Sequence, residues 1–235
     1  MNTPSAARPL VSIVVPCYKG ERFLAATLES CLRQTHRELE VIVVDDASPD
    51  CCAEIAEGFA NRDPRFRLIR QSVNGGVSRA FNAGFAAAKG GFMTRLAQDD
   101  LFREDAVEMM VCHLEQHPEA GLVYCDEQRI DEAGKVVGQI PRPEPDRIRE
   151  GGNRFGLCFL WRRAVWEQVG SFDPRFDTAE DFDFLLRVCE HVAISKCRDG
   201  APFFMRQHAG MGSRVFAAKQ EVLGAQILAR HSGFL

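Results

Sequence analysis

Two runs rich in β-branched apolar residues near the amino end restrict the fold of this chain more than any other sequence feature. Residues 11–15 read VSIVV and residues 39–44 read LEVIVV, without the alternation of apolar and polar residues that a half-exposed strand shows. Such β-branched runs are typical of strands buried on both faces of a parallel sheet. Between them, apolar side chains recur at helical spacing within 21–34. The pattern predicts a βαβ unit.

The same alternation continues along the chain. It predicts helices over 51–61, 77–88, 104–116, 179–189 and 215–230, strands over 66–70 and 92–97, a further apolar run at 121–124, regular structure over 159–169, and apolar runs at 192–194 and 202–205. We therefore expect an α/β fold, a single Rossmann-like domain whose mostly parallel central sheet is flanked by helices. In such folds ligands bind at the carboxyl ends of the strands.

Three boundaries follow from composition. We expect residues 1–9 to form a flexible tail, residues 10–214 the folded domain and residues 215–235 a carboxyl-terminal helix. Residues 126–153 are polar and rich in Arg, Pro, Gly and Asp, with Pro141, Pro143 and Pro145 in alternation. This composition predicts a long mobile excursion. The segment can be a substrate lid or acceptor platform, or it can be a plain solvated connection; the sequence favours neither.

Charge and cysteine content exclude several classes of protein. Lys and Arg total 29 against 33 Asp and Glu, a net charge of −4, so we expect no nucleic-acid partner. The nine cysteines are odd in number and never spaced CxxC, which favours a reducing, cytoplasmic location over a disulfide framework. Because no apolar run reaches about 18 residues, we expect neither a transmembrane segment nor a secretion signal.

Acidic residues occur in adjacent pairs where predicted elements begin or end. The pairs are Asp45-Asp46 after the second strand, Asp99-Asp100 after the fourth strand and Glu180-Asp181 at the start of a helix. Carboxylates at strand ends suit Mg²⁺ or Mn²⁺, which take oxygen ligands and share them with substrate phosphates. Two of the pairs also have a simpler interpretation, because Asp46 or Ser48 can cap the next helix and Glu180-Asp181 can complement a helix dipole.

Two further segments contain candidate ligands for anions. Gly75 and Gly76 precede a helix, so the backbone there can approach an anion closely. His208 lies in a polar, glycine-containing segment between Arg206 and Arg214, where guanidinium groups can bind phosphate and imidazole can bind a metal. No GxGxxG, Walker or GxSxG motif occurs.

Three blocks of sequence together resemble a known family. They are VSIVVPCYKGERFLAATLESCLRQTHRELEVIVVDDASPD, NGGVSRAFNAGFAAAKGGFMTRLAQDD and FLWRRAVWEQVGSFDPRFDTAEDFDFLLRV. Each is similar to a conserved block of the inverting, nucleotide-sugar-dependent glycosyltransferases of family 2, which have the GT-A fold. The likeness covers roughly residues 10–215. It implies a nucleotide-binding half over about 10–100 and an acceptor half over about 101–214.

The resemblance also implies roles for single residues. Asp181 takes the place of the catalytic base, and Glu180 is positioned to help orient the acceptor. Asp99, Asp100 and His208 fall where the family binds Mn²⁺ or Mg²⁺, which bridges the donor's diphosphate. The residues implied in nucleotide binding are Pro16, Tyr18, Glu21, Asp46, Gly76, Ser78, Arg79 and Asp99.

The chain departs from the family pattern at two positions. Ala97 stands where the family commonly has the first acid of the metal-binding strand, a usual ribose contact. Phe81 stands where an Arg often holds diphosphate, and Arg79 lies two residues earlier.

The implied function is transfer of a sugar, with a UDP-sugar as the expected donor, to a saccharide or glycolipid acceptor in surface polysaccharide or glycolipid synthesis. The implied location is the cytoplasm, and peripheral contact with the inner face of the membrane is compatible with it. The alternative is a GT-A domain that binds a nucleotide or serves as a scaffold without turnover. A sugar-nucleotide-forming nucleotidyltransferase is disfavoured, since Pro16-Cys17-Tyr18-Lys19-Gly20 is not a glycine-rich basic loop.

Overall fold

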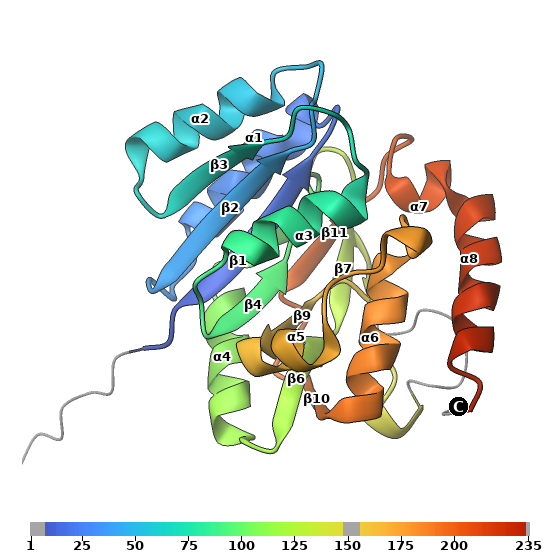
Figure 1. Ribbon diagram of the computed structural model, residues 1–235. Coiled ribbons are helices and arrows are strands. Elements are labelled where there is room, and N and C mark those ends of the chain that lie inside the picture. The colour runs from blue at the N-terminus through green and yellow to red at the C-terminus, as the bar shows by residue number, and fades with distance from the viewer. Residues whose placement is uncertain (1–7, 148–155, 234–235) are drawn as a thin grey trace, which may run out of the picture.

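The expected alternation of strands and helices is present in the computed structural model, which describes residues 8–147 and 156–233 (Figure 1). The helices are α1 (Glu21–Leu32), α2 (Cys52–Arg62), α3 (Val77–Ala87), α4 (Ala106–Gln116), α5 (Arg163–Val169), α6 (Glu180–His191), α7 (Gly212–Val215) and α8 (Ala217–Arg230), with 3-10 turns η1 (Pro145–Arg147) and η2 (Pro174–Phe176). The strands are β1 (Val11–Cys17), β2 (Leu39–Asp45), β3 (Phe66–Arg70), β4 (Phe92–Arg95), β5 (Leu101–Phe102), β6 (Ala120–Cys125), β7 (Glu127–Ile130), β8 (Val136–Ile140), β9 (Phe159–Arg162), β10 (Ala193–Cys197) and β11 (Phe203–Arg206).

A seven-stranded sheet in the order β10-β6-β9-β4-β1-β2-β3 forms the centre of the molecule. All neighbouring pairs are parallel except those of β9, which runs antiparallel to both β4 and β6. The expectation of an α/β fold with a mostly parallel central sheet is therefore confirmed. Since β1, β2 and β4 run in the same direction, their carboxyl ends meet at one edge of the sheet.

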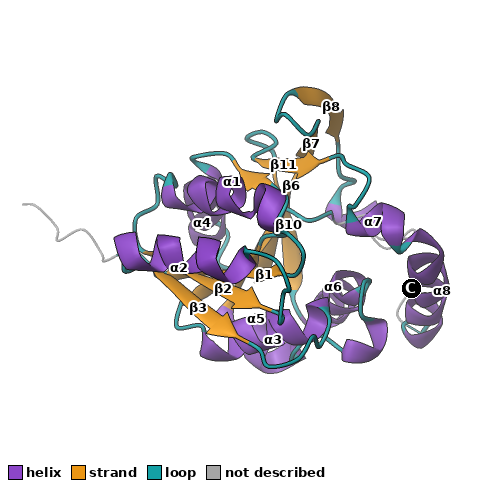
Figure 2. Cartoon of the chain, turned by 90° about the horizontal axis from the view of Figure 1, so that it is seen from above, coloured by secondary structure: helices purple, strands orange, loops and turns teal. Residues whose placement is uncertain are grey.

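Helices cover both faces of this sheet, as the continuous apolar runs of β1 and β2 require. Val11, Ile13 and Val15 pack toward α1, α2 and α4, whereas Val14 belongs to a second core cluster with α3, α5, α6 and α8. Figure 2 shows the first group of helices on one side of the sheet and α3, α5 and α6 on the other. Every residue of β1 and β2 is buried.

A second, four-stranded sheet, ordered β5-β11-β7-β8, corrects one expectation. Residues 126–153 were expected to be a long mobile excursion, but β7 and β8 form an antiparallel hairpin within them. The turn between the strands contains Gly134 at φ +89°, a conformation that glycine adopts without strain. The segment is polar because β8 lies at the edge of the sheet and is largely exposed. Residues 148–153 lie outside the described residues.

The two ends of the chain were expected to be a flexible tail and a helix. Residues 1–7 lie outside the described residues, and Arg8 and Pro9 are held by an ion pair with Glu108 and a hydrogen bond to His36. At the other end, α8 packs against α6 through Leu223 and Ile227. Within residues 8–147 and 156–233, the helices are too short or too polar to cross a bilayer.

Candidate active site

The acidic pairs of the first half of the chain emerge at the carboxyl edge of the central sheet. Cys17 at the end of β1 pairs with Asp45 at the end of β2, and the Asp46 N–H donates to the Cys17 carbonyl. On the other side of β1, the Leu96 N–H donates to the Val14 carbonyl and extends the β4 pairing toward Asp99. Asp46 and Asp99 therefore leave the sheet on either side of β1.

Main-chain and side-chain hydrogen bonds fix the loop that follows β1. The Tyr18 N–H donates to Gln98 Oε1 at 2.8 Å, and Gln98 Nε2 donates to the Tyr18 carbonyl at 3.1 Å. Glu21 Oε2 accepts the Cys51 N–H at 3.0 Å, which ties the β1–α1 loop to the β2–α2 loop. Pro16 is buried within β1, whereas the Tyr18 side chain is exposed. Of these expected nucleotide-binding residues, Tyr18 and Glu21 are exposed, whereas Pro16 is buried.

Asp46 is buried and joins the second loop to the turn before α3. Its two carboxylate oxygens accept the N–H groups of Gly75 and Gly76 at 2.8 and 2.9 Å. The simpler interpretation, a cap on the next helix, is wrong for Asp46, because Asp50 accepts the N–H of Cys52, the first residue of α2. Gly76 has φ +88°, which a residue with a Cβ rarely adopts.

A protein carboxylate lies at the start of α3, where we expected a bound anion. The Ser78 N–H donates to Asp177 Oδ1 at 2.9 Å, and a Cβ at Gly76 would meet this carboxylate. The Ser78 Oγ is buried without a hydrogen-bond partner among the described residues. Arg79 Nη1 donates to the Gly75 carbonyl at 3.2 Å. Asp177 supplies the negative charge that a helix N-terminus favours.

Asp99 and His208 come together although 109 positions separate them in the sequence. Asp99 Oδ2 lies 2.8 Å from His208 Nε2, and the imidazole ring also contacts Phe23 at a centroid distance of 4.8 Å. Sequence spacing gave no reason to pair these residues. The segment after β11 carries His208 past the end of β4.

Asp100 differs from Asp99 because it is buried. Its Oδ1 accepts the Arg206 N–H at 2.9 Å, and burial, followed by the neighbouring Asp99, raises the pKa of Asp100. We expected the Arg206 guanidinium to be available to phosphate. Its Nε and Nη1 instead donate to the main-chain carbonyls of Asp99, Asp131 and Glu132, which attaches the β7–β8 turn to the acidic segment.

Asp99 and His208 fit a divalent cation in part. A carboxylate oxygen and an imidazole nitrogen are ligands that Mn²⁺ accepts, and such ions usually complete their shell with water and substrate phosphates. No cluster of three or more His, Cys, Asp and Glu residues that could hold a metal occurs within residues 8–147 and 156–233. The protein would therefore supply a partial shell that a diphosphate completes.

Glu180 and Asp181 open α6 beside the end of β4, where both face Arg95. Arg95 Nη1 lies 3.1 Å from Asp181 Oδ2 and 3.6 Å from Glu180 Oε1. All three side chains are buried. Burial is the largest effect on Glu180 and raises its pKa to about 7; Arg95 acts in the opposite direction and Asp181 in the same one.

Phe81, the apolar residue found where the resemblance led us to expect Arg, has a clear structural partner. The Arg95 guanidinium lies over its ring, with Cζ 4.6 Å from the ring centroid. Sequence reasoning missed Arg95, Gln98 and Asp177. A signal existed for Arg95, since it is the one charged residue in the strand sequence FMTR of β4.

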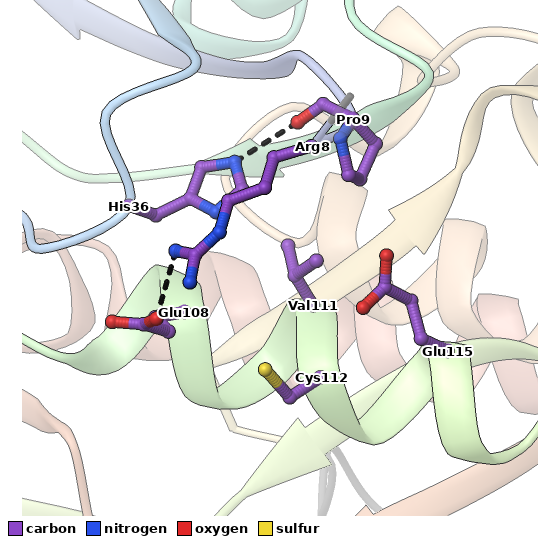
Figure 3. Close-up of a pocket in the computed structure, with 7 residues that line it drawn as sticks. All are labelled: Arg8, Pro9, His36, Glu108, Val111, Cys112 and Glu115. Carbon is purple, nitrogen blue, oxygen red and sulfur yellow. Dashed lines mark hydrogen bonds and ion pairs between the residues drawn. The ribbon is translucent and has the colours of Figure 1, made fainter. Parts of the chain in front are cut away.

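A separate pocket lies at the amino edge of the same sheet (Figure 3). It is lined by residues that precede β1 and β2 and by the outer side of α4. Arg8 pairs with Glu108, and the His36 ring donates to the Pro9 carbonyl. The pocket contains none of the expected site residues, so the acidic carboxyl edge is the candidate active site.

The family can now be assigned from sequence comparison. The sequence model of the family described as "Glycosyl transferase family 2" matches residues 12–164, which include the ends of β1, β2 and β4. The chain belongs to glycosyl transferase family 2. The resemblance seen in the sequence blocks is thereby confirmed.

One curated relative of this family 2 chain is the O-antigen biosynthesis protein RfbC of Myxococcus xanthus. The two are 33% identical over 236 residues, which cover 95% of this chain and 18% of RfbC. For two further curated relatives, the chain spans 21% and 62% of their length. The chain is thus considerably shorter than these three relatives.

Solved structures of low sequence identity share the fold. TarS from S. aureus, in complex with UDP-GlcNAc, superposes with a TM-score of 0.74 at 21% identity, covering 95% of this chain and 73% of that one. The mannosyltransferase PcManGT from Pyrobaculum calidifontis, in complex with GDP-Man and Mn²⁺, gives 0.73 at 18% identity, covering 96% and 64%. The fold of this family 2 chain is the GT-A fold.

Proposed function

We propose that this chain moves a sugar from a nucleoside-diphosphate sugar, with a UDP-sugar as the expected donor, to an acceptor hydroxyl with inversion at the anomeric carbon. The observation that carries the proposal is the placement of the pairs Glu180-Asp181 and Asp99-His208 at the carboxyl edge of one sheet. Both pairs are anchored to β4 or to the segment that follows it. Ligands bind at this edge in open α/β sheets.

The reaction is a single in-line displacement. The acceptor oxygen forms a bond to the anomeric carbon as the bond to the diphosphate oxygen breaks, and the Asp181 carboxylate takes the acceptor proton. Glu180 beside it orients the acceptor. General-base assistance of this kind typically contributes about 10²–10⁴-fold in rate. The products are the glycosylated acceptor and a nucleoside diphosphate.

Asp99 and His208 are the residues that would hold Mn²⁺ or Mg²⁺. Asp100, the next residue, is buried and accepts the Arg206 N–H. A bound divalent cation offsets the charge that develops on a departing diphosphate. Tyr18, Asp46 and the turn at Gly76 face the nucleotide in this proposal. Their loops are fixed by the hydrogen bonds of Gln98, Glu21 and Asp46, so this region is organised before the donor binds.

The names of similar proteins support the proposed substrates. TarS was solved with UDP-GlcNAc, PcManGT with GDP-Man and Mn²⁺, and RfbC is named for O-antigen biosynthesis. We infer a saccharide or glycolipid acceptor and a part in surface polysaccharide synthesis. All nine cysteines are free thiols, which supports a cytoplasmic location; peripheral contact with a membrane is compatible with it.

A panel of UDP-, GDP- and dTDP-sugars tests the proposal. We expect slow hydrolysis of one donor in the presence of Mn²⁺, measured by NMR or mass spectrometry. EDTA should abolish this hydrolysis. Nucleotide binding detected by thermal shift without turnover of any donor would instead favour the alternative, a GT-A domain that binds nucleotides or serves as a scaffold.

Asp181→Asn tests the assignment of the base. We expect transfer to fall by about 10²–10⁴-fold, because the amide cannot take the acceptor proton, while nucleotide affinity stays near the wild-type value. Asp63→Asn is the matched control, since Asp63 also pairs with an arginine, Arg65, but precedes β3 at the opposite edge of the sheet. Transfer at the wild-type rate by Asp181→Asn would remove Asp181 from the mechanism.

A further inference from the structure

Arg95 is a buried cation at the end of an otherwise uncharged strand. It is the last residue of β4 and follows Phe92, Met93 and Thr94, all of which are buried. Its side chain is 8% exposed. A guanidinium in such a place loses most of its contact with water and needs compensating charge.

That compensation comes from the first turn of α6. Asp181 Oδ2 lies 3.1 Å and Glu180 Oε1 3.6 Å from Arg95 Nη1, while the Phe81 ring supports the guanidinium. The other oxygen of Asp181, Oδ1, accepts the Phe182 N–H at 2.8 Å. Each carboxylate oxygen of Asp181 therefore has its own contact, an ion pair on Oδ2 that lacks hydrogen-bond geometry and a main-chain hydrogen bond on Oδ1.

The surrounding charges make the arginine necessary. Asp177 acts on Glu180 from the segment before α6, and Asp100 lies near Arg95 on the β4 side, with Asp99 next to it. Two adjacent buried carboxylates in this acidic setting repel one another. Arg95 is the cation that contacts both of them, and its position on a central strand makes it rigid.

We propose that Arg95 is a positioning residue that holds Asp181 in the orientation for proton abstraction and lets Glu180 lie buried beside it. The inference rests on the proposed function, because it assigns Arg95 a part in the same transfer reaction. Arg95 acts through the two carboxylates and contacts neither donor nor acceptor.

Kinetics of Arg95→Met and Arg95→Lys test the proposal. We expect Arg95→Met to lower kcat by about 10–100-fold, since small displacements of a catalytic group have effects of this size, with donor KM within about 2-fold of wild type. Arg95→Lys keeps the charge and should recover part of kcat. An active wild-type enzyme whose Arg95→Met variant retains kcat within about 2-fold would overturn the inference.

Arg162→Met is the matched control. Arg162 ends β9, next to β4, donates to the Ala120 and Leu114 carbonyls, and lies over the Phe92 ring. Its loss removes comparable structural contacts at the other edge of the sheet. We expect kcat of this variant to stay within about 2-fold of wild type even if its melting temperature falls.

A double-mutant cycle measured by melting temperature tests the ion-pair arrangement and needs no activity assay. At pH 8, where Glu180 is ionised in the wild type, Arg95→Met should lower the melting temperature, and adding Glu180→Gln should restore part of the loss, because one unpaired buried acid is removed. Purely additive effects of the two substitutions would overturn the inference. If no donor is turned over by the wild type, the proposed function fails, and this cycle still decides whether Arg95 holds the carboxylates.

Discussion

Glu180 and Asp181 are neighbours in sequence, yet their hydrogen bonding differs. Both are buried, but Asp181 has an ion pair at 3.1 Å and a main-chain N–H on its other oxygen, whereas Glu180 has the longer contact to Arg95. The raised pKa of Glu180, about 7, follows chiefly from that burial. A pair of acids in different environments suits different tasks, one as a base and the other as an orienting group.

Stability should therefore depend on pH through Glu180. Its pKa is raised from 4.5 to about 7 on folding, so the native state keeps a proton that the unfolded chain has already lost between these pH values. The free energy of unfolding then falls by about 3 kcal/mol as pH rises through this window. Glu180→Gln should flatten this slope in urea unfolding between pH 4.5 and 8. An unchanged slope in Glu180→Gln would show that other groups cause it.

A second prediction at the residue scale concerns Asp99 and His208, which lie 2.8 Å apart. If both bind the cation, His208→Ala should raise the Mn²⁺ concentration for half-maximal activity by at least about 10-fold, with partial recovery at high Mn²⁺. His117→Ala is the control, since His117 pairs with Glu119 on the surface. Equal Mn²⁺ dependence of wild type and His208→Ala would exclude His208 as a ligand.

Among the elements, α6 links the candidate site to the carboxyl-terminal helix. Asp183 is fully buried one turn from the start of α6 and accepts hydrogen bonds from Arg187 at 2.8 Å and from Arg230 at 3.1 Å. The His231 ring lies between Asp183 and Glu190, with its two nitrogens facing one carboxylate each. This network attaches the end of α8 to the helix that carries Asp181.

Asp183→Asn should weaken that attachment. Removing one partner from a buried ion network leaves unpaired charges and costs about 3 kcal/mol or more in unfolding free energy. Hydrogen exchange in α8 should accelerate more than in β1 or β2. Glu29→Gln is the control, because the pairs of Glu29 with Arg33 and Arg62 are exposed and contribute less than about 1 kcal/mol. Similar losses in both variants would contradict the role of the network.

How well the elements could be predicted depended on how locally their signal is encoded. The strands over 11–15 and 39–44 were predictable because they are mostly apolar and lie next to helices of regular period. The strand over 66–70, FRLIR, contains two arginines and was predictable from its place in the alternation of strands and helices. The hairpin β7–β8 was missed because its sequence is polar, and its pairing with β11 joins residues far apart in the chain.

The candidate site was predictable in part for the same reason. Strand ends indicated Asp46 and Asp99, and the helix start indicated Asp181. The contacts of Asp99 with His208 and of Asp181 with Arg95 depend on how distant segments pack, which no local spacing encodes.

On the scale of the whole molecule, the candidate site is assembled from both halves of the chain. Asp46 and Asp99 come from the first half, and Asp181 and His208 come from the second. Several contacts cross between the halves at the sheet edge, among them Ser78 with Asp177, Arg95 with Asp181, and Asp99 with His208. A ligand that bridges these groups therefore stabilises the packing of the halves as well as its own loops.

Nucleotide and metal together should raise the melting temperature more than either alone. At a free ligand concentration of about 100 times Kd, binding stabilises the native state by about 2.7 kcal/mol. For a chain of this size each kcal/mol shifts the melting temperature by about 2–4 °C, so UDP with Mn²⁺ should raise it by about 5–10 °C. Asp99→Asn should lose most of the Mn²⁺-dependent part and keep most of the shift caused by UDP alone, because the hydrogen bonds that fix the loops around Tyr18 and Gly76 come from Gln98, Glu21 and Asp46. The same shift with UDP in EDTA as in Mn²⁺ would show that no cation links the diphosphate to Asp99 and His208.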